Sequence, residues 1–183
     1  MKTTLRWFVP AVGLAVAALL LPAAARAECG LTPAAWEGHG SSADPIVGMW
    51  QVTFTAQGNP PGGPPDGAVL DNAFAQWHSD GTEIMNSSRN PVTQSYCLGV
   101  WEGVGHRRYR LNHFGISWDP TVPDHPLGPA NIREDVTLSS DGKTFSGTFT
   151  IDQYDDSKNL LAHLAGQVQG RRITVDTTGG SLS

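Results

Sequence analysis

Residues 107–118, RRYRLNHFGISW, decide the fold, because polar and apolar side chains alternate along 108–113. Successive side chains of an extended strand point to opposite faces, so Tyr109 and His113 share one face while Arg108 and Arg110 take the other. Residues 130–138, ANIREDVTL, alternate in the same way and place Glu134 on an otherwise apolar face. Both stretches are predicted to be β-strands with one face in a core and the other in water.

Outward from these two stretches, alternating runs rich in aromatic and β-branched residues are separated by short turn sequences. Ser-Asp-Gly at 79–81 and again at 140–142 suits a tight hairpin between antiparallel strands. A glycine at position 170 is expected to separate the last two strands. The pattern predicts nine strands, at 47–56, 71–79, 82–88, 95–104, 107–118, 130–139, 144–154, 160–169 and 171–176.

The strand pattern predicts an all-β domain. Consecutive antiparallel strands leave unpaired edges unless the sheet closes on itself, so we expect a single up-and-down antiparallel barrel of eight to nine strands. A β-sandwich is the alternative, but it usually needs longer crossover connections. A short N-terminal helical turn is predicted at 33–37. An eight-stranded barrel has an interior just wide enough for one small ligand.

Two segments are too rich in proline to join a sheet ladder, residues 58–67 and residues 119–129. They are expected to be loops, either passive connections or a rim over an opening of the barrel.

The inner faces of the strands are predicted to be mainly aromatic and aliphatic. Strand 95–104 is expected to turn Tyr96, Leu98, Val100 and Glu102 inward. Aromatic walls suit flat ligands, which stack on them. The predicted ligand-binding side chains are Trp50, Phe54, Tyr96, Tyr109, Phe145 and Phe149.

His113 and Glu134 stand out as polar groups on inner faces. If residues 119–129 join neighbouring strands symmetrically, the two side chains lie close together. A histidine and a carboxylate in an apolar cavity shift each other's pKa and can act as a general base held in orientation by an acid. They are therefore candidate catalytic residues, although such a pair can also be a purely structural polar network.

Residues 1–27 have the pattern of a signal peptide. Lys2 and Arg6 precede an apolar stretch at 9–21, and Ala25-Arg26-Ala27 fits a cleavage site. The apolar stretch is short for a membrane span, although an uncleaved anchor helix is the alternative. The expected mature chain is residues 28–183, one domain, periplasmic or secreted and not inserted in a membrane.

The mature chain keeps two cysteines, Cys29 and Cys97. In an exported protein an even pair most simply forms one disulfide bond, which here would close a long loop. Two free buried thiols are the alternative.

Composition excludes several classes of function. Cleavage removes three of the 12 basic residues and none of the 17 acidic ones, so the net charge falls from −5 to −8. Such an acidic chain does not suit nucleic-acid binding. The six histidines lack the spacings of a metal site, and we expect neither a metal nor a cofactor.

The first predicted strand opens with Gly48-Met49-Trp50, which resembles the G-x-W motif of lipocalins and related calycin barrels. The resemblance implies a small-ligand barrel whose Trp50 plugs the closed end, with Arg171 or Arg172 stacked on it as a cation–π contact. In outline the chain is also similar to allene-oxide-cyclase-like barrels, which include enzymes.

Three functions fit these observations. The first is an exported barrel that binds a small hydrophobic molecule, such as an aromatic or polyene compound. The second is a cofactor-independent isomerase, cyclase or lyase in which His113 moves a proton and Glu134 orients it. The third is an interaction protein whose proline-rich loops dock in a partner. The sequence does not determine the oligomeric state.

Overall fold

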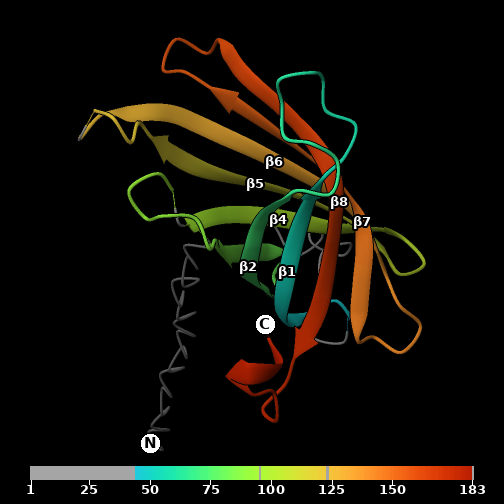
Figure 1. Cartoon of the computed structure of the whole chain (residues 1–183). Coiled ribbons are helices and arrows are strands. Elements are labelled where there is room, and N and C mark those ends of the chain that lie inside the picture. The colour runs from blue at the N-terminus through green and yellow to red at the C-terminus, as the bar shows by residue number, and fades with distance from the viewer. Residues whose placement is uncertain (1–43, 95, 123, 183) are drawn as a thin grey trace, which may run out of the picture.

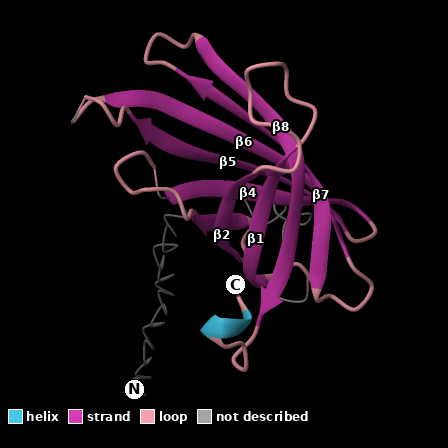
Figure 2. Cartoon of the chain, in the orientation of Figure 1, coloured by secondary structure: helices cyan, strands magenta, loops and turns pink. Residues whose placement is uncertain are grey.

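The computed structural model describes residues 44–94, 96–122 and 124–182, and within them eight antiparallel strands close into one barrel in sequence order (Figures 1 and 2). The predicted up-and-down barrel is thereby confirmed. The strands are β1 (Gly48–Ala56), β2 (Val69–Trp77), β3 (Thr82–Asn86), β4 (Tyr96–Gly105), β5 (Arg108–Trp118), β6 (Pro126–Leu138), β7 (Thr144–Tyr154) and β8 (Leu160–Ile173).

The count is eight strands because Gly170 does not end a strand. It lies inside β8, where it is paired with Phe145 of β7. A Cβ atom at this position would lie 2.1 Å from a ring carbon of Phe145. The glycine is required by the packing of that ring, and the prediction of a turn there was wrong.

The two ends of the barrel differ. Turns 78–81, 106–107 and 139–143 lie at one end, called here the closed end, together with the C-terminal residues 174–182 (Figure 1). The longer loops 57–68, 87–94, 119–125 and 155–159 lie at the opposite, open end. Strands β5 to β8 have 11 to 14 residues, whereas β3 has five, so the barrel wall is higher on one side than on the other.

The predicted loop at 119–129 is shorter than expected, because Pro126 and Pro129 begin strand β6. Both pair with β5, but the pairing of β6 with β7 starts only at Ala130. A strand segment with one unpaired side tolerates proline, which lacks an N–H donor. The predicted loop 58–67 lies at the open end, consistent with a rim.

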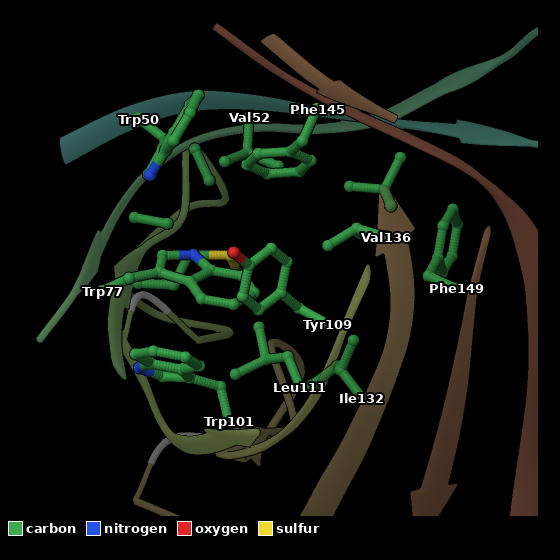
Figure 3. Close-up of a cluster of buried hydrophobic side chains, with 14 of the residues drawn as sticks. Trp50, Val52, Trp77, Trp101, Tyr109, Leu111, Ile132, Val136, Phe145 and Phe149 are labelled. Atoms are coloured by element: carbon green, nitrogen blue, oxygen red, sulfur yellow. The ribbon is translucent and has the colours of Figure 1, made fainter. Parts of the chain in front are cut away.

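Aromatic side chains fill the closed half of the barrel (Figure 3). Trp77 contacts Trp101 and Phe145 with ring centroids 5.5 and 6.0 Å apart, and Trp50 contacts Phe145 at 5.0 Å. Such tilted and edge-on pairs favour association beyond the area they bury. This aromatic plug, defined by Trp50, Trp77, Trp101, Tyr109 and Phe145, makes the closed end solid.

Arg172 packs against the aromatic plug at the closed end of the barrel. Its guanidinium carbon lies 4.1 Å from the centre of the Trp50 ring, as the resemblance to lipocalins implies. The same guanidinium donates hydrogen bonds to the carbonyl oxygens of Val47, at 2.9 Å, of Gly142, at 2.7 Å, and of Pro45. Trp50 in turn donates from Nε1 to the carbonyl oxygen of Ile46, at 2.9 Å. The segment entering β1 is thus fixed across the closed end.

The predicted orientation of the 95–104 strand was wrong. Tyr96, Leu98 and Val100 of β4 lie on the outer face of the barrel, and the interior receives Cys97 and Trp101 instead. Glu102 also lies outside, where it forms an ion pair with Arg110. The strand carries apolar side chains on both faces, so alternation alone does not choose between them, and a one-residue error in register inverts every side chain.

Several sequence predictions lie outside the described residues. They are the helical turn at 33–37, the signal peptide with its cleavage site, and Cys29. Within the described residues, no helix has the length and apolar character needed to cross a bilayer.

Candidate functional site

A histidine and two glutamates are buried together inside the barrel. His113 Nδ1 lies 3.2 Å from Glu83 Oε2, and His113 Nε2 lies 3.7 Å from Glu134 Oε1. At most 3% of each residue is exposed. The structure therefore brings the two predicted catalytic residues together and adds Glu83, which the sequence analysis missed. We call the three residues the buried triad.

A glycine on β4 makes the buried triad possible. Gly99 is paired with Glu83 of β3 on one side and with His113 of β5 on the other. A Cβ atom there would lie 2.5 Å from His113 Cβ and 2.9 Å from Glu83 Oε2. Because the glycine leaves this space free, the two side chains meet above β4. Glu134 reaches His113 diagonally, since its own direct partner on β5 is Leu111.

Burial and mutual charge control protonation in the triad. Burial raises the pKa of Glu134 to about 7, and the charge of Glu83 adds to this while His113 opposes it. For His113, burial acts to lower the pKa, but the hydrogen bond and charge of Glu83 and the charge of Glu134 outweigh it, so the pKa is raised. The neighbouring glutamates therefore favour the protonated form of His113, and Glu134 is close to its point of half-protonation near pH 7.

The raised pKa of Glu134 predicts how stability depends on pH. Between pH 4.5 and about 7 the folded chain holds a proton that the unfolded chain has released, so the free energy of unfolding should fall as pH rises through this window. His113 acts in the same direction, because stability from a raised histidine pKa is present below the unfolded pKa, about 6.5, and is lost as pH rises through the folded pKa. Urea unfolding from pH 4.5 to 8 measures this slope.

A neutral isostere isolates the contribution of Glu134. Glu134→Gln should flatten the slope between pH 4.5 and 7, whereas Glu102→Gln, a change at an exposed carboxylate, should leave it unchanged. The carboxyls with lowered pKa values, such as Asp80 and Asp141, lose their stabilising effect near pH 3.8 and below, outside this window. An identical slope in wild type and Glu134→Gln would contradict the assignment.

A separate cavity of about 150 Å³ lies toward the open end of the barrel. Its walls are apolar and its mouth is polar. The apolar walls come from Phe54, Leu70, Met85, Cys97, Ile132, Ile151 and Leu164. The polar lining consists of Asp71, Ser87, Arg89 and Gln94.

The two charges at the mouth are not equivalent. Asp71 accepts hydrogen bonds from the Ser87 hydroxyl and from the backbone N–H and hydroxyl of Ser88, the latter two at 2.9 and 2.8 Å. These donors offset its charge. The guanidinium of Arg89, in contrast, is exposed and forms no ion pair with a described residue. The mouth therefore presents a free cation above an apolar cavity.

The predicted ligand-binding residues are divided between three places. Phe54 lines the cavity, and Phe149 packs against Phe54 with ring centroids 5.1 Å apart. Trp50, Tyr109 and Phe145 belong to the aromatic plug, and the Tyr109 hydroxyl donates to Asp44 Oδ1 at 2.7 Å. Tyr96 lies outside the barrel. The open space is smaller than predicted, because the rings of the aromatic plug pack against one another.

The sequence carries a signal for the inward position of Glu83. Across the 78–81 turn it is the direct partner of Trp77, whose large ring faces the interior. Residues paired across an antiparallel ladder lie on the same face of the sheet, so an inward Trp77 implies an inward Glu83.

Cys97 is buried, lines the cavity and has no disulfide partner among the described residues. Burial is the main cause that raises its pKa to about 12, with the charge of Glu83 adding to it. Gln94 donates from Nε2 to its sulfur at 3.3 Å. Because Cys29 lies outside the described residues, the bond between the two cysteines stays a prediction.

No group of three or more His, Cys, Asp or Glu side chains in the described part of the chain is arranged to hold a metal ion. Comparison with protein-family models, with curated proteins and with solved structures found no match for this chain. The closed eight-stranded barrel, with Arg172 stacked on Trp50, is compatible with a lipocalin-like fold.

Proposed function

We propose that this protein binds a small hydrophobic molecule with an anionic group in the cavity at the open end of the barrel. The observation that carries the proposal is an apolar cavity with a free guanidinium, that of Arg89, at its mouth. An apolar cavity of roughly 150 Å³ in a protein core accepts a molecule the size of benzene. The volume therefore favours one aromatic ring, or a branched alkyl group of similar size, over a long polyene.

Electrostatics select the polar group of the ligand. A ring seated between Phe54 and Met85 leaves its substituent near Arg89, where a carboxylate gains a charge-assisted hydrogen bond. Asp71 is engaged by Ser87 and Ser88, which weakens its repulsion of an anion. We expect affinity to decrease from 3-phenylpropionate to 3-phenylpropanol to 3-phenylpropylamine, measured by isothermal titration calorimetry.

Two pairs of variants test the position of the ligand. Ile151→Trp places a large ring in the cavity and should reduce binding of 3-phenylpropionate at least about tenfold, since it removes the space for a ring. Leu161→Trp, on an exposed position of β8, should bind as wild type does. Arg89→Glu should abolish the preference for the anionic probe, whereas Arg108→Glu, an exposed position at the closed end, should keep it.

Equal affinity for all three probes would contradict the role of Arg89, and full binding by the Ile151→Trp variant would contradict the cavity as the site.

The enzyme hypothesis has less support. The raised pKa values of His113 and Glu134 suit proton transfer, but none of the three residues of the buried triad lines the cavity. A ligand seated there touches the neighbouring Ile132 instead.

We also propose that the chain is exported, that residues 1–27 are removed, and that Cys29 and Cys97 form a disulfide bond. The support is the sequence pattern of the first 27 residues together with the even pair of cysteines. Intact-mass measurement of the protein from the periplasm or medium should give a chain that begins at Glu28. Alkylation in denaturant should label neither cysteine before reduction and both after it. A full-length chain retained in the cell would contradict export.

A further inference from the structure

The outer face of strands β3 to β5 carries a group of large apolar side chains. Leu98 of β4 is paired with Ile84 of β3 and with Phe114 of β5, so the three form one row across the sheet. Tyr96 and Val100 flank Leu98 along β4, and Ile116 follows Phe114 along β5. We call these six residues, Ile84, Tyr96, Leu98, Val100, Phe114 and Ile116, the outer apolar patch.

The exposure of this patch is unusually high for apolar residues. Leu98 is 64% exposed, Ile116 62% and Tyr96 60%. Taking about 200 Å² for each whole large side chain, the six together expose roughly 600 Å². That equals the upper end for the largest apolar patch on a typical monomer, and patches of this size mark interaction sites. β4 is apolar on its inner face as well, and a strand that is apolar on both faces is typical of a sheet covered on both sides.

We infer that the outer apolar patch is the interface of a homodimer, in which a second copy of this chain packs its own β3–β5 face against it. A standard interface buries about 800 Å² on each partner. The patch supplies most of this area as an apolar centre, and the surrounding polar side chains would form the rim. No residue of the patch is charged, so two acidic chains can approach there without opposing like charges at the centre.

Two other occupants fit the patch less well. Residues 28–43, which precede the described chain, contain only two large apolar side chains, Leu31 and Trp36, too few to cover six. An anionic lipid surface would be attracted by a basic border, but Arg110 beside the patch is neutralised by Glu102, at 3.0 Å. A second copy, in contrast, presents six apolar side chains on a matching sheet face.

Sedimentation equilibrium of the mature chain, residues 28–183, tests the inference. We expect a mass twice that of the monomer at about 100 µM and dissociation on dilution. Leu98→Glu places a carboxylate at the centre of the patch, close to its own symmetry mate, and should weaken dimerisation at least about 100-fold. Its side chain is exposed, so the far-UV circular dichroism of the folded barrel should be retained.

The matched control is Gln169→Glu, which introduces the same charge on the outer face of β8, away from the patch, and should dimerise as wild type does. If Leu98→Glu fails to fold, Leu98→Ser removes the apolar contact without adding charge and replaces it. A wild-type chain that stays monomeric at about 100 µM overturns the inference, as does a Leu98→Glu dimer of unchanged affinity.

Discussion

A single added methyl group at position 99 should destabilise the barrel by about 4 kcal/mol or more. In Gly99→Ala the new Cβ atom would lie 2.5 Å from His113 Cβ and 2.9 Å from Glu83 Oε2. The histidine Cβ is fixed to the β5 backbone and cannot rotate away, so either the strands separate or the triad is broken. Breaking it leaves buried charges without their partner, which is the larger of the two costs.

The free energy of unfolding of Gly99→Ala is measured by chemical denaturation, with Gly103→Ala as the control variant. Gly103 lies on the same strand and on the same side of the pleat, but its added Cβ atom would meet only the Tyr109 ring, at an ordinary 3.9 Å. Gly103→Ala is expected to change stability by less than about 1 kcal/mol. Similar losses in both variants would show that any side chain weakens β4 and that the space over Gly99 has no special role.

Removal of the arginine under the aromatic plug should cost about 3 kcal/mol. Arg172→Ala deletes the cation–π contact with Trp50 and the hydrogen bonds to the carbonyl oxygens of Pro45, Val47 and Gly142. Those carbonyls belong to the segment before β1 and to the β6–β7 turn, so both should loosen. Thermal unfolding gives the loss, and hydrogen exchange should show faster exchange in residues 45–50.

Arg171→Ala is the control for that variant. Arg171 is the next residue on β8, and its side chain lies on the outside, bonded to Gln51 Oε1 at 3.0 Å and to the Ser181 carbonyl oxygen. Loss of exposed contacts of this kind should cost less than about 1 kcal/mol. If both variants lose the same stability, the contribution of Arg172 is that of any surface arginine and the plug does not depend on it.

The parts of the fold that the sequence predicted are those in which only one face of a strand is apolar. In β6 and in the first half of β5 polar residues alternate with apolar ones, so the inner positions of Tyr109, His113 and Glu134 followed directly. β4 defeated the same reasoning because Cys97 and Trp101 face in while Leu98 and Val100 face out, all of them apolar. Which side chains of such a strand face the interior is set by its pairing with the neighbouring strands and not by its own sequence pattern.

The site was predicted less completely than the fold, for a related reason. The pairing of His113 with Glu134 needed only two adjacent strands, whereas Glu83 lies two strands away and reaches His113 across the space above Gly99. This contact depends on the missing side chain at position 99. Hydrophobic periodicity does not show where a side chain must be missing. The cavity likewise depends on how the aromatic rings of the closed end pack together in three dimensions. The pattern of residues along each strand does not show this packing.

The uneven height of the barrel wall gives the cavity a direction. β3 ends after five residues, and the segment from Ser87 to Gln94 that follows it forms part of the mouth, whereas β8 on the far side continues for 14 residues. We therefore expect a ligand of the proposed kind to enter and leave sideways, over the short strand and past Arg89. We expect the loop above β3 to govern the residence time of such a ligand, and its equilibrium affinity to depend on Arg89 together with the apolar walls beneath.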